Sequence, residues 1–371
     1  MSAGDLRVDS AVPGVSIERV GELPAEWDAL VAADPGAGFF QSRRWLAAVL
    51  TAWPDARPHL LLARRNDPGG SRDREVLGGV VAIERGRGLL RRIHGLPQAT
   101  HGGPVMALDA PGGWGDLSGA RPWVDDGCDA WFGGTALGGA LVTALFEGAQ
   151  AAEVRLVDAS GAGGDRVTVC PGAAGEFPTT RLLDLESSLE SLWRECGSGC
   201  RYAIKRARRD GWRVQRRGAR DMPEIRRLAQ IARRERGLAL NVPNSLLAAL
   251  ESGTDGPWGG VDVWVGLRDG GAVEAALLNL RHGHRAQNYM AVASEIGRKG
   301  GVQNLLHWSA IEHGSEAGVR VYDFGASPGL PRVERFKASF GAQEFRVRHW
   351  RWRSPHWRAL VALRAGLQRC R

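Results

Sequence analysis

The chain has 371 residues, of which 43% are hydrophobic and 24% charged, values that are ordinary for globular proteins and allow two domains. Its first residues lack a basic segment followed by an apolar one, and about 18 consecutive apolar residues occur nowhere, so we expect neither a signal peptide nor a membrane-spanning helix. The five cysteines are an odd, scattered set without metal-site spacing, which predicts reduced thiols in a cytoplasmic protein.

The positive charge is concentrated in the second half of the chain. Of the net charge of +8, residues 194–236 carry +10 and residues 332–371 carry +9, which leaves −11 for the rest. Such asymmetry indicates a polyanionic partner, which would be nucleic acid, an anionic membrane surface or a phosphorylated substrate. A solvated face in an arginine-rich composition is the alternative.

The first half predicts a mixed α/β unit. Alternation indicates strands at 15–20, 59–63, 76–83, 89–93 and 154–157. Helices are expected at 24–33, 43–53 and 135–149, the second of them capped by Ser42. Ala, Gly and Pro then dominate residues 159–178, which we interpret as the domain boundary.

The second half predicts another mixed unit. Helices are expected at 189–195, 202–209, 221–237, 302–317 and 334–339, and a basic amphipathic helix at 357–367. Strands are expected at 180–185, 261–267, 273–280, 286–292, 319–324 and 344–352.

Several motifs of this half occur together in the FemAB-like family of GNAT acyltransferases. They are VRVYDFGAS at 319–327, RFKASFGA at 335–342, RYAIKRARRDG at 201–211, NYMAVAS at 288–294 and QNLLHWSAIE at 303–312. In the first half, FQSRRW at 40–45 and HGGPV at 101–105 also match. The chain therefore resembles this family over most of its length, most strongly at 180–341.

The resemblance implies an α/β (α+β) fold of two tandem GNAT-like lobes, each a mixed, mostly antiparallel sheet flanked by helices, with a cleft between them. We expect an N-terminal lobe at 1–177, a C-terminal FemAB-like lobe at 178–345, and a closing strand and basic helix at 346–371. The implied activity is transfer of an aminoacyl group from aminoacyl-tRNA to an amine of a peptidoglycan precursor or a small peptide-like natural product. It needs no metal or other cofactor, because aminoacyl-tRNA is a co-substrate.

Lys337 and Tyr289 are the expected catalytic residues. Lys337 is one of only three lysines in an arginine-rich chain, and its compact ammonium could stabilise an oxyanion or anchor a phosphate. Tyr289 matches a family strand tyrosine, with core packing as the alternative. The motif residues expected to contact substrate are Gln41, Arg43, Arg44, Asn304, Asp323 and Phe336. Asp323 also fits a role in ordering its loop.

The expected tRNA-binding residues lie in the two basic blocks. Arg201, Lys205, Arg208 and Arg209 have the spacing of one helix face. Arg348 belongs to an alternation of arginine with tryptophan at 346–353, which is typical of nucleic-acid surfaces but also of a half-buried strand. The apolar and basic residues of 357–367 fit a membrane surface as well.

Two other functions stay open. An acetyl-CoA-dependent GNAT enzyme needs a glycine-rich turn, and residues 298–303 read RKGGVQ, with Gln303 where Gly or Ala is expected. A non-catalytic nucleic-acid-binding protein is the third possibility. We expect no integral membrane association, and the oligomeric state is left open.

Overall fold

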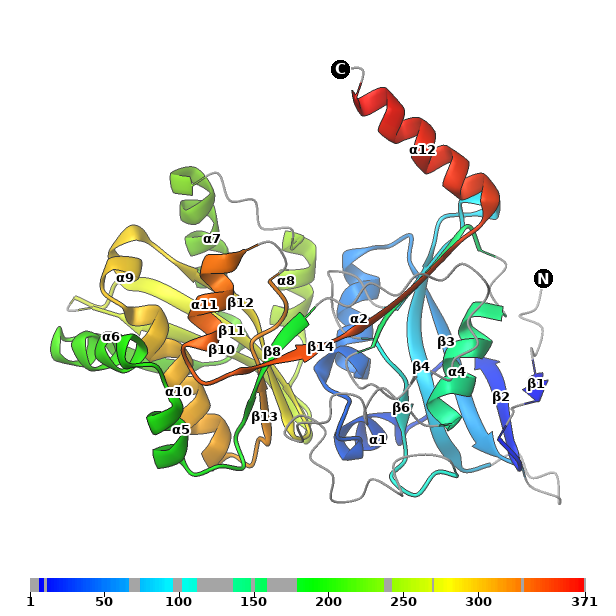
Figure 1. Cartoon of the computed structure of the whole chain (residues 1–371), viewed down its shortest axis with the longest axis horizontal. Helices are drawn as coiled ribbons and strands as arrows, with labels where there is room; N and C mark the ends of the chain where they lie inside the picture. The colour runs from blue at the N-terminus through cyan, green and yellow to red at the C-terminus, as the bar shows by residue number, and fades with distance from the viewer. Residues whose placement is uncertain are drawn as a thin grey trace. The chain divides into compact units, whose positions relative to one another are not determined.

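The computed structural model describes residues 7–9, 12–66, 74–95, 102–111, 136–147, 151–158, 179–236, 242–268, 270–327 and 330–369. The chain forms two compact units, one from residues 1–178 together with 347–371 and the other from Thr179–Arg346 (Figure 1). The sequence-predicted boundary segment 159–178 lies outside the described residues.

The first unit is built around a mixed, mostly antiparallel sheet. Its strands are β1 (Arg7–Asp9), β2 (Val15–Val20), β3 (Arg57–Arg65), β4 (Val76–Arg85), β5 (Arg92–His94), β6 (Val105–Met106), β7 (Glu153–Asp158) and β15 (Arg348–Arg353). They are ordered β1-β2-β3-β4-β5-β7-β15, with β6 paired to β4. Neighbours are antiparallel except β5 and β7, which are parallel.

The helices of this unit are α1 (Trp27–Ala33), η1 (Phe39–Gln41), α2 (Arg43–Ala52), η2 (Gly88–Leu90), α4 (Ala136–Glu147) and α12 (Pro355–Arg369). As predicted, Ser42 caps α2, and its hydroxyl accepts a hydrogen bond from the backbone N–H of Trp45 at 3.2 Å. Buried leucines of α4, among them Leu141 and Leu145, pack with sheet residues such as Val80 and Leu156 to form the core.

The strand predicted at 344–352 is wrong as a single element. It is two strands, β14 (Gln343–Arg346) and β15, which belong to different sheets. β14 pairs with β8 of the second unit, whereas β15 pairs with β7 of the first, from Arg348 opposite Asp158 to Arg353 opposite Glu153. Burial of Trp350 in the first core fixes that pairing. The segment 346–371, expected to stand apart, therefore contributes a strand and a helix to the first unit.

The second unit has the same kind of sheet. Its other strands are β8 (Thr179–Asp184), β9 (Arg213–Arg217), β10 (Gly259–Leu267), β11 (Val273–His282), β12 (Arg285–Ala293) and β13 (Val321–Asp323). The order is β14-β8-β13-β12-β11-β10-β9, and only β12 and β13 are parallel neighbours. The helices are α5 (Leu189–Glu195), α6 (Ser198–Arg209), η4 (Ala219–Asp221), α7 (Met222–Arg236), α8 (Asn244–Ser252), α9 (Glu295–Lys299), α10 (Val302–Glu316) and α11 (Pro331–Ala338).

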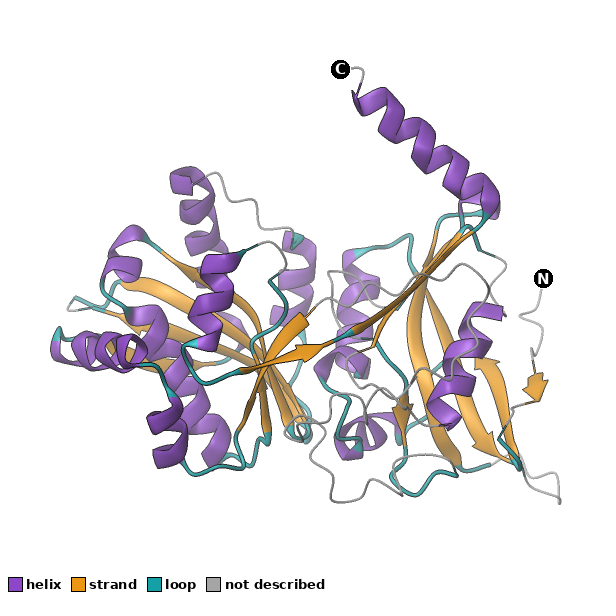
Figure 2. Ribbon diagram, viewed as in Figure 1, coloured by secondary structure: helices purple, strands orange, loops and turns teal. Residues whose placement is uncertain are grey.

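Helices cover both faces of this second sheet (Figure 2). Successive strand residues point to opposite faces, so Ala275 and Leu277 of β11 meet the core formed with α5, α6 and α10. The alternate residues Ala276 and Leu278 are equally buried, on the side contacted by α7. The sheet is therefore buried on both sides, which explains why β10 and β11 read as nearly continuous apolar runs.

The structure corrects the prediction in a few other places. The strand predicted at 89–93 starts only at Arg92, because Gly88 has a φ of 51° and Leu89 and Leu90 form an exposed 3-10 turn. The short elements β9, α8 and α9 were not predicted. Cys196 and Cys200 are buried free thiols, and the other three cysteines lie outside the described residues. No described helix combines the length and apolar composition needed to cross a bilayer.

Candidate active site in the second unit

The sheet of the second unit opens between β12 and β13. These parallel strands pair only from Arg285 opposite Val321 to Gln287 opposite Asp323, while β12 continues to Ala293. A pocket of about 370 Å³ lies at this end of β12. Its lining comes from β12, α9, the N-cap of α10, α10 itself, the residue after β13, and α11. The lining residues are Asn288, Ala291, Ala293, Arg298, Gly301, Gln303, Asn304, His307, Phe324, Val333, Phe336 and Lys337.

The N-terminus of α10 forms one wall of this pocket. Gly301 is the N-cap and has a left-handed backbone with φ of 72°, which glycine adopts without steric cost. The first N–H groups of a helix lack intrahelical partners and give that end a partial positive charge. Arg298 of α9 is also a lining residue, and its guanidinium lies 3.6 Å from the carboxylate of Glu235. This part of the pocket therefore suits an anionic group of a ligand.

Lys337 brings a buried ammonium group to the pocket. The side chain comes from α11, the residue is only 6% exposed, and Nζ donates a hydrogen bond to the carbonyl oxygen of Gly325 at 2.5 Å. Burial lowers the pKa of Lys337 below its usual value, although the carboxylates of Glu334 and Asp323 oppose this effect. A positive charge held in a poorly solvated place interacts more strongly with a developing negative charge than one in water.

Two predicted substrate-binding residues lie in the same lining. Asn304, on the first turn of α10, donates a hydrogen bond from Nδ2 to Sγ of Cys200 at 3.5 Å. Phe336, next to Lys337 on α11, packs edge-on against His307 and Phe340, with ring centroids 5.3 Å apart in both pairs. The structure thus brings Lys337, Asn304 and Phe336 together in one pocket.

His307 is a pocket residue that sequence reasoning missed. Its Nδ1 lies 3.1 Å from the hydroxyl of Tyr322, which in turn donates to Oδ1 of Asn279 at 3.3 Å. The imidazole also stacks on Phe324 at 5.3 Å. Burial lowers the pKa of His307 to about 3, so the ring is neutral at physiological pH. The sequence offered one signal for it, because His307 lies one helical turn after Asn304 and therefore on the same face of the helix.

Asp323 occupies a structural position beside the site, and it is not among the described residues that line the pocket. Its carboxylate is fully buried and accepts hydrogen bonds from Thr180 Oγ1, Arg285 and the N–H of Gly325, each at 2.7 Å. The hydrogen bond from the N–H of Gly325 orders the loop that begins at Phe324. The carbonyl oxygen of the same Gly325 accepts the hydrogen bond from Lys337. These contacts favour the loop-ordering interpretation of Asp323.

Tyr289 lies on β12 but is also absent from the described lining of the pocket. The pairing with β11 changes register here, since Leu278 lies opposite Met290 and Asn279 opposite Asn288. Tyr289 is therefore the extra residue of a β-bulge, which re-aims side chains on the bulged strand. Burial raises the pKa of its hydroxyl well above the usual value.

The predicted tRNA-binding residues of α6 have different surroundings. Arg201 donates hydrogen bonds to the carbonyl oxygens of Trp193, Arg194 and Cys196, and thereby caps the end of α5. Lys205 lies over the ring of Trp193 at 5.9 Å. Arg208 and Arg209 are exposed. Arg208 forms an ion pair with Glu312 at 3.1 Å, and Arg209 lies 3.7 Å from Asp210. Of the four, only Arg201 has a clear structural role.

The remaining predicted residues belong to the first unit. Gln41 is 2% exposed and its side chain accepts a hydrogen bond from the N–H of Gly38. Arg43 bonds the carbonyl oxygens at Leu23 and Pro24, and Arg44 lies over the ring of Phe39 at 5.9 Å.

Arg348 is the first residue of β15 in the same unit. The α6 residues and Arg348 therefore come from different units.

Comparison with known protein families gives a match in the second unit. The profile of the family described as acetyltransferase (GNAT) domain matches residues 196–338, which include the whole pocket lining. No curated protein sequence matches. The second unit is therefore similar to a GNAT acetyltransferase domain over most of its length.

Solved structures extend the likeness to both units. The chain is similar to FemX with a TM-score of 0.62 and 12% identity, covering 93% of this chain and 99% of that one. It is also similar to L-PGS from Bacillus licheniformis, with a TM-score of 0.52, 12% identity and coverages of 93% and 98%. It is similar as well to a protein of unknown function from Bacteroides thetaiotaomicron, with a TM-score of 0.51 and 12% identity, covering 92% of this chain and 100% of that one. The predicted α/β fold of two mixed, mostly antiparallel sheets flanked by helices is confirmed, and FemX shares this fold over nearly the whole chain.

Proposed function

We infer that this protein is an acyltransferase that moves an aminoacyl group from aminoacyl-tRNA to an amine. The observation that carries this inference is the pocket between β12 and β13, where the ammonium of Lys337 and the N-terminus of α10 line one cavity. A pocket with two fixed sources of positive charge suits a reaction in which negative charge develops on a carbonyl oxygen.

The reaction needs few groups from the protein. The acceptor nitrogen attacks the carbonyl carbon of the aminoacyl ester and forms the new C–N bond. The tetrahedral intermediate carries its negative charge on the former carbonyl oxygen, and we assign the stabilisation of this charge to the ammonium of Lys337, a residue of the pocket lining. Cleavage of the C–O bond then releases the ribose hydroxyl of the tRNA, which takes up the proton lost by the amine. Neutral His307 can hydrogen-bond a substrate group, but burial makes it a weak base.

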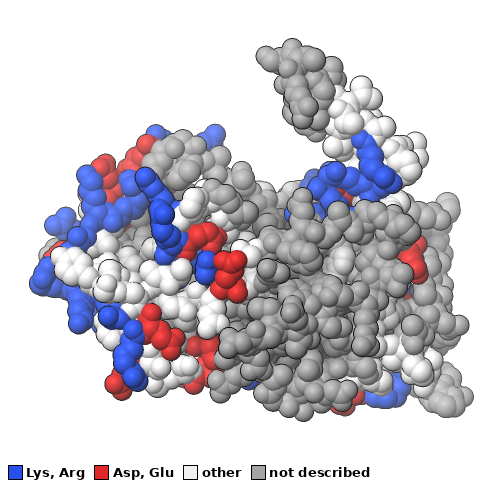
Figure 3. Space-filling view, viewed as in Figure 1, with Lys and Arg blue, Asp and Glu red and all other residues white. Residues whose placement is uncertain are grey.

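Two features support aminoacyl-tRNA as the donor. The FemAB-like family that the motifs resemble uses this donor, and the fold shared with FemX covers 93% of the chain. The exposed residues Lys205, Arg208 and Arg209 lie along α6, where Lys and Arg side chains gather (Figure 3). Phosphates of a tRNA would be attracted to such a face. The acceptor would be a peptidoglycan precursor or a small peptide-like amine.

The second candidate is an acyl-CoA-dependent N-acyltransferase. The left-handed Gly301 before α10 favours it, because a glycine turn at a helix N-terminus can hold a pyrophosphate. The side chain of Gln303 lies in the lining of the same pocket, where an acetyl-CoA enzyme needs a small residue. This residue makes acyl-CoA the weaker of the two candidates.

The deciding experiment compares donors. The full chain is incubated with labelled aminoacyl-tRNAs or labelled acetyl-CoA, a panel of amine acceptors, and with or without RNase. We expect transfer from aminoacyl-tRNA that RNase abolishes. RNase-insensitive transfer from acetyl-CoA would establish the second candidate instead. Salt-dependent tRNA binding without transfer to any acceptor would favour a non-catalytic nucleic-acid-binding protein.

A further inference from the structure

The first unit carries an exposed apolar surface formed by η2 and α12. On η2, Leu89 and Leu90 are 75% and 54% exposed, and on α12, Leu360 and Leu363 are 48% and 64% exposed. The imidazole Nε2 of His356 lies 2.9 Å from the carbonyl oxygen of Leu89, which holds the start of α12 beside η2. We call the exposed apolar residues of these two segments, namely Leu89, Leu90, Leu360, Val361 and Leu363, the η2–α12 surface.

On α12 the exposed residues of this surface belong to one uninterrupted exposed stretch. Residues 358–363 of α12 are all exposed, so this stretch of helix turns no side chain into a core. Five of its six residues are Ala, Leu or Val. In Figure 1 the helix leads away from the strand β15 that precedes it. An exposed apolar patch of this kind marks an interaction site rather than ordinary surface.

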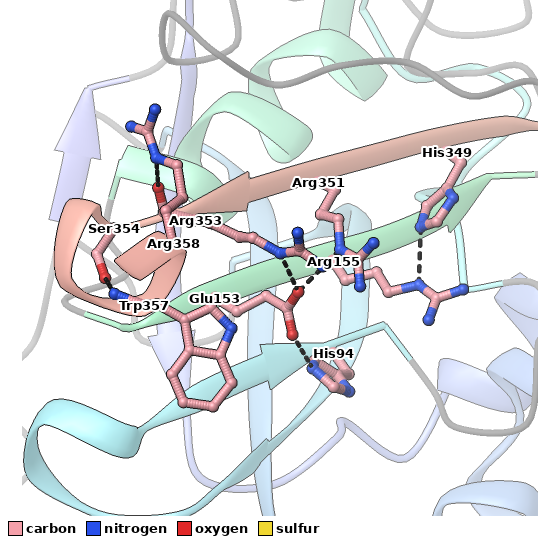
Figure 4. Close-up of polar contacts among 9 residues, drawn as sticks. All are labelled: His94, Glu153, Arg155, His349, Arg351, Arg353, Ser354, Trp357 and Arg358. Carbon is pink, nitrogen blue, oxygen red and sulfur yellow. Dashed lines mark hydrogen bonds and ion pairs between the residues drawn. The ribbon is translucent and has the colours of Figure 1, made fainter. Parts of the chain in front are cut away.

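Basic side chains gather at the base of α12, where the surface begins (Figure 3). Figure 4 shows how they are held: the buried carboxylate of Glu153 accepts hydrogen bonds from Arg351 at 2.8 Å and Arg353 at 3.0 Å. Arg92 lies 5.6 Å from the ring of Trp357, and Arg358 follows on the first turn of the helix. The carboxylate of Glu153 pairs with two of these four guanidiniums, so the four arginines and Glu153 together keep a net positive charge at the base of α12.

We propose that the η2–α12 surface docks onto a phospholipid membrane that contains anionic lipid. Residues 355–371 contain four arginines and no acidic residue, which gives charge complementarity to anionic headgroups. Leucine and valine beside arginine and tryptophan are the composition of helices that lie in the membrane interface. A nucleic-acid surface pairs its basic residues with aromatic rings that stack on bases, whereas the exposed residues here are aliphatic.

The length of α12 agrees with docking rather than spanning. Its 15 residues extend over roughly 22 Å, which is shorter than the ~30 Å hydrocarbon core of a bilayer. The helix therefore lies along the surface with Leu360 and Leu363 inserted at the headgroup boundary, and Arg351 and Arg353 face the phosphates. This docking concerns the first unit alone and is independent of the pocket in the second unit.

Vesicle co-sedimentation of the full chain tests the proposal. Wild-type protein should pellet with vesicles in which phosphatidylglycerol replaces part of the phosphatidylcholine, much less with phosphatidylcholine alone, and less as salt is raised. The double variant Leu360→Gln/Leu363→Gln removes two exposed leucines and should lower the partition coefficient by about tenfold or more. Arg358→Gln should lower it by about fivefold on anionic vesicles only.

Leu108→Gln is the matched control, because Leu108 is a 50% exposed leucine of the same unit outside the η2–α12 surface. This variant should bind vesicles like the wild type. The proposal is overturned if wild-type protein does not pellet with anionic vesicles, or if the double variant pellets equally well. It is also overturned if the double variant loses tRNA binding or self-association while vesicle binding is unchanged, which would assign the surface to nucleic acid or to a second copy.

Discussion

The two units of this protein use the same strand arrangement. In each, antiparallel strands lead to a parallel pair, β5 with β7 in the first unit and β12 with β13 in the second. A helix, α4 or α10, precedes the second strand of each pair in the chain. The next strand of the sheet is antiparallel and comes from another part of the chain, β15 in the first unit and β8 in the second.

The units differ at the end of the parallel pair. In the second unit the strands part after Gln287 and Asp323, and the pocket lies there. In the first unit the backbone continues to bond β7, since the N–H of Gly95 donates to Arg155 and that of Gly102 to Val157, both at 2.7 Å. A Cβ at Gly95 would lie 2.4 Å from Cδ1 of Leu156, so the space is already filled. The same strand arrangement thus leaves a pocket in the second unit and is packed at the corresponding end in the first.

The largest effect should come from the carboxylate that fixes the open pair. Asp323→Ala leaves Arg285 buried without its 2.7 Å ion pair, and we expect the second unit to lose about 3–5 kcal/mol of unfolding free energy, measured by urea denaturation. Glu344→Ala removes an exposed partner of Arg181 and should cost under about 1 kcal/mol. Equal losses in the two variants would contradict the assigned role of Asp323.

The second prediction separates the site from its scaffold. Lys337→Met removes the pocket ammonium and should lower the turnover of the transfer reaction by about 100-fold, while tRNA binding changes little. Lys299→Met alters a lysine whose side chain is 78% exposed on α9 and should keep wild-type turnover. If both variants turned over equally, Lys337 would have no part in the chemistry.

The third prediction tests the closed pair. Gly95→Ala places a methyl group against Leu156, which is fully buried, and overpacking should cost the first unit about 1–3 kcal/mol. Turnover per folded molecule should not change. Gly21→Ala, where the added Cβ meets no atom within 4 Å, is the control and should be nearly neutral. A neutral Gly95→Ala would mean that this end of the first sheet is open too.

The last prediction concerns pH, and its effect per pH unit is the smallest of the four. The pKa of His307 falls from its ordinary 6.5 to about 3 on folding, so the unfolded chain binds more protons between these values. The stability of the second unit should therefore decline by up to ~1.4 kcal/mol per pH unit as the pH falls below 6.5, and level off near 3. His307→Gln should remove this slope, and His284→Gln, at an exposed position, should retain it. Unfolding curves at several pH values check both.

Strong periodicity made most elements predictable, including the meander β10 to β12 and helix α10. Strand propensity could not show that the strand predicted at 344–352 divides at Val347, because residues on both sides of Val347 favour a strand. The division depends on which strands they pair with, β8 on one side and β7 on the other. Among the pocket residues, Lys337 could be predicted because lysine is rare in this chain, and Asn304 and Phe336 because they belong to family motifs. His307 and the bulge at Tyr289 depend on burial and register, which appear only when the sheet is assembled.

The division at Val347 also sets an order on synthesis. β7 must wait for β15, which leaves the ribosome only after the whole second unit has been made. The two strands are 195 residues apart, counted from Glu153 to Arg348, so at about 5–20 residues per second the delay is roughly 10–40 s. During that interval the edge of β7 is unpaired and open to misassociation. The first unit is therefore begun first and finished last, and a ribosome that stalls late releases a chain whose N-terminal half is the incomplete one.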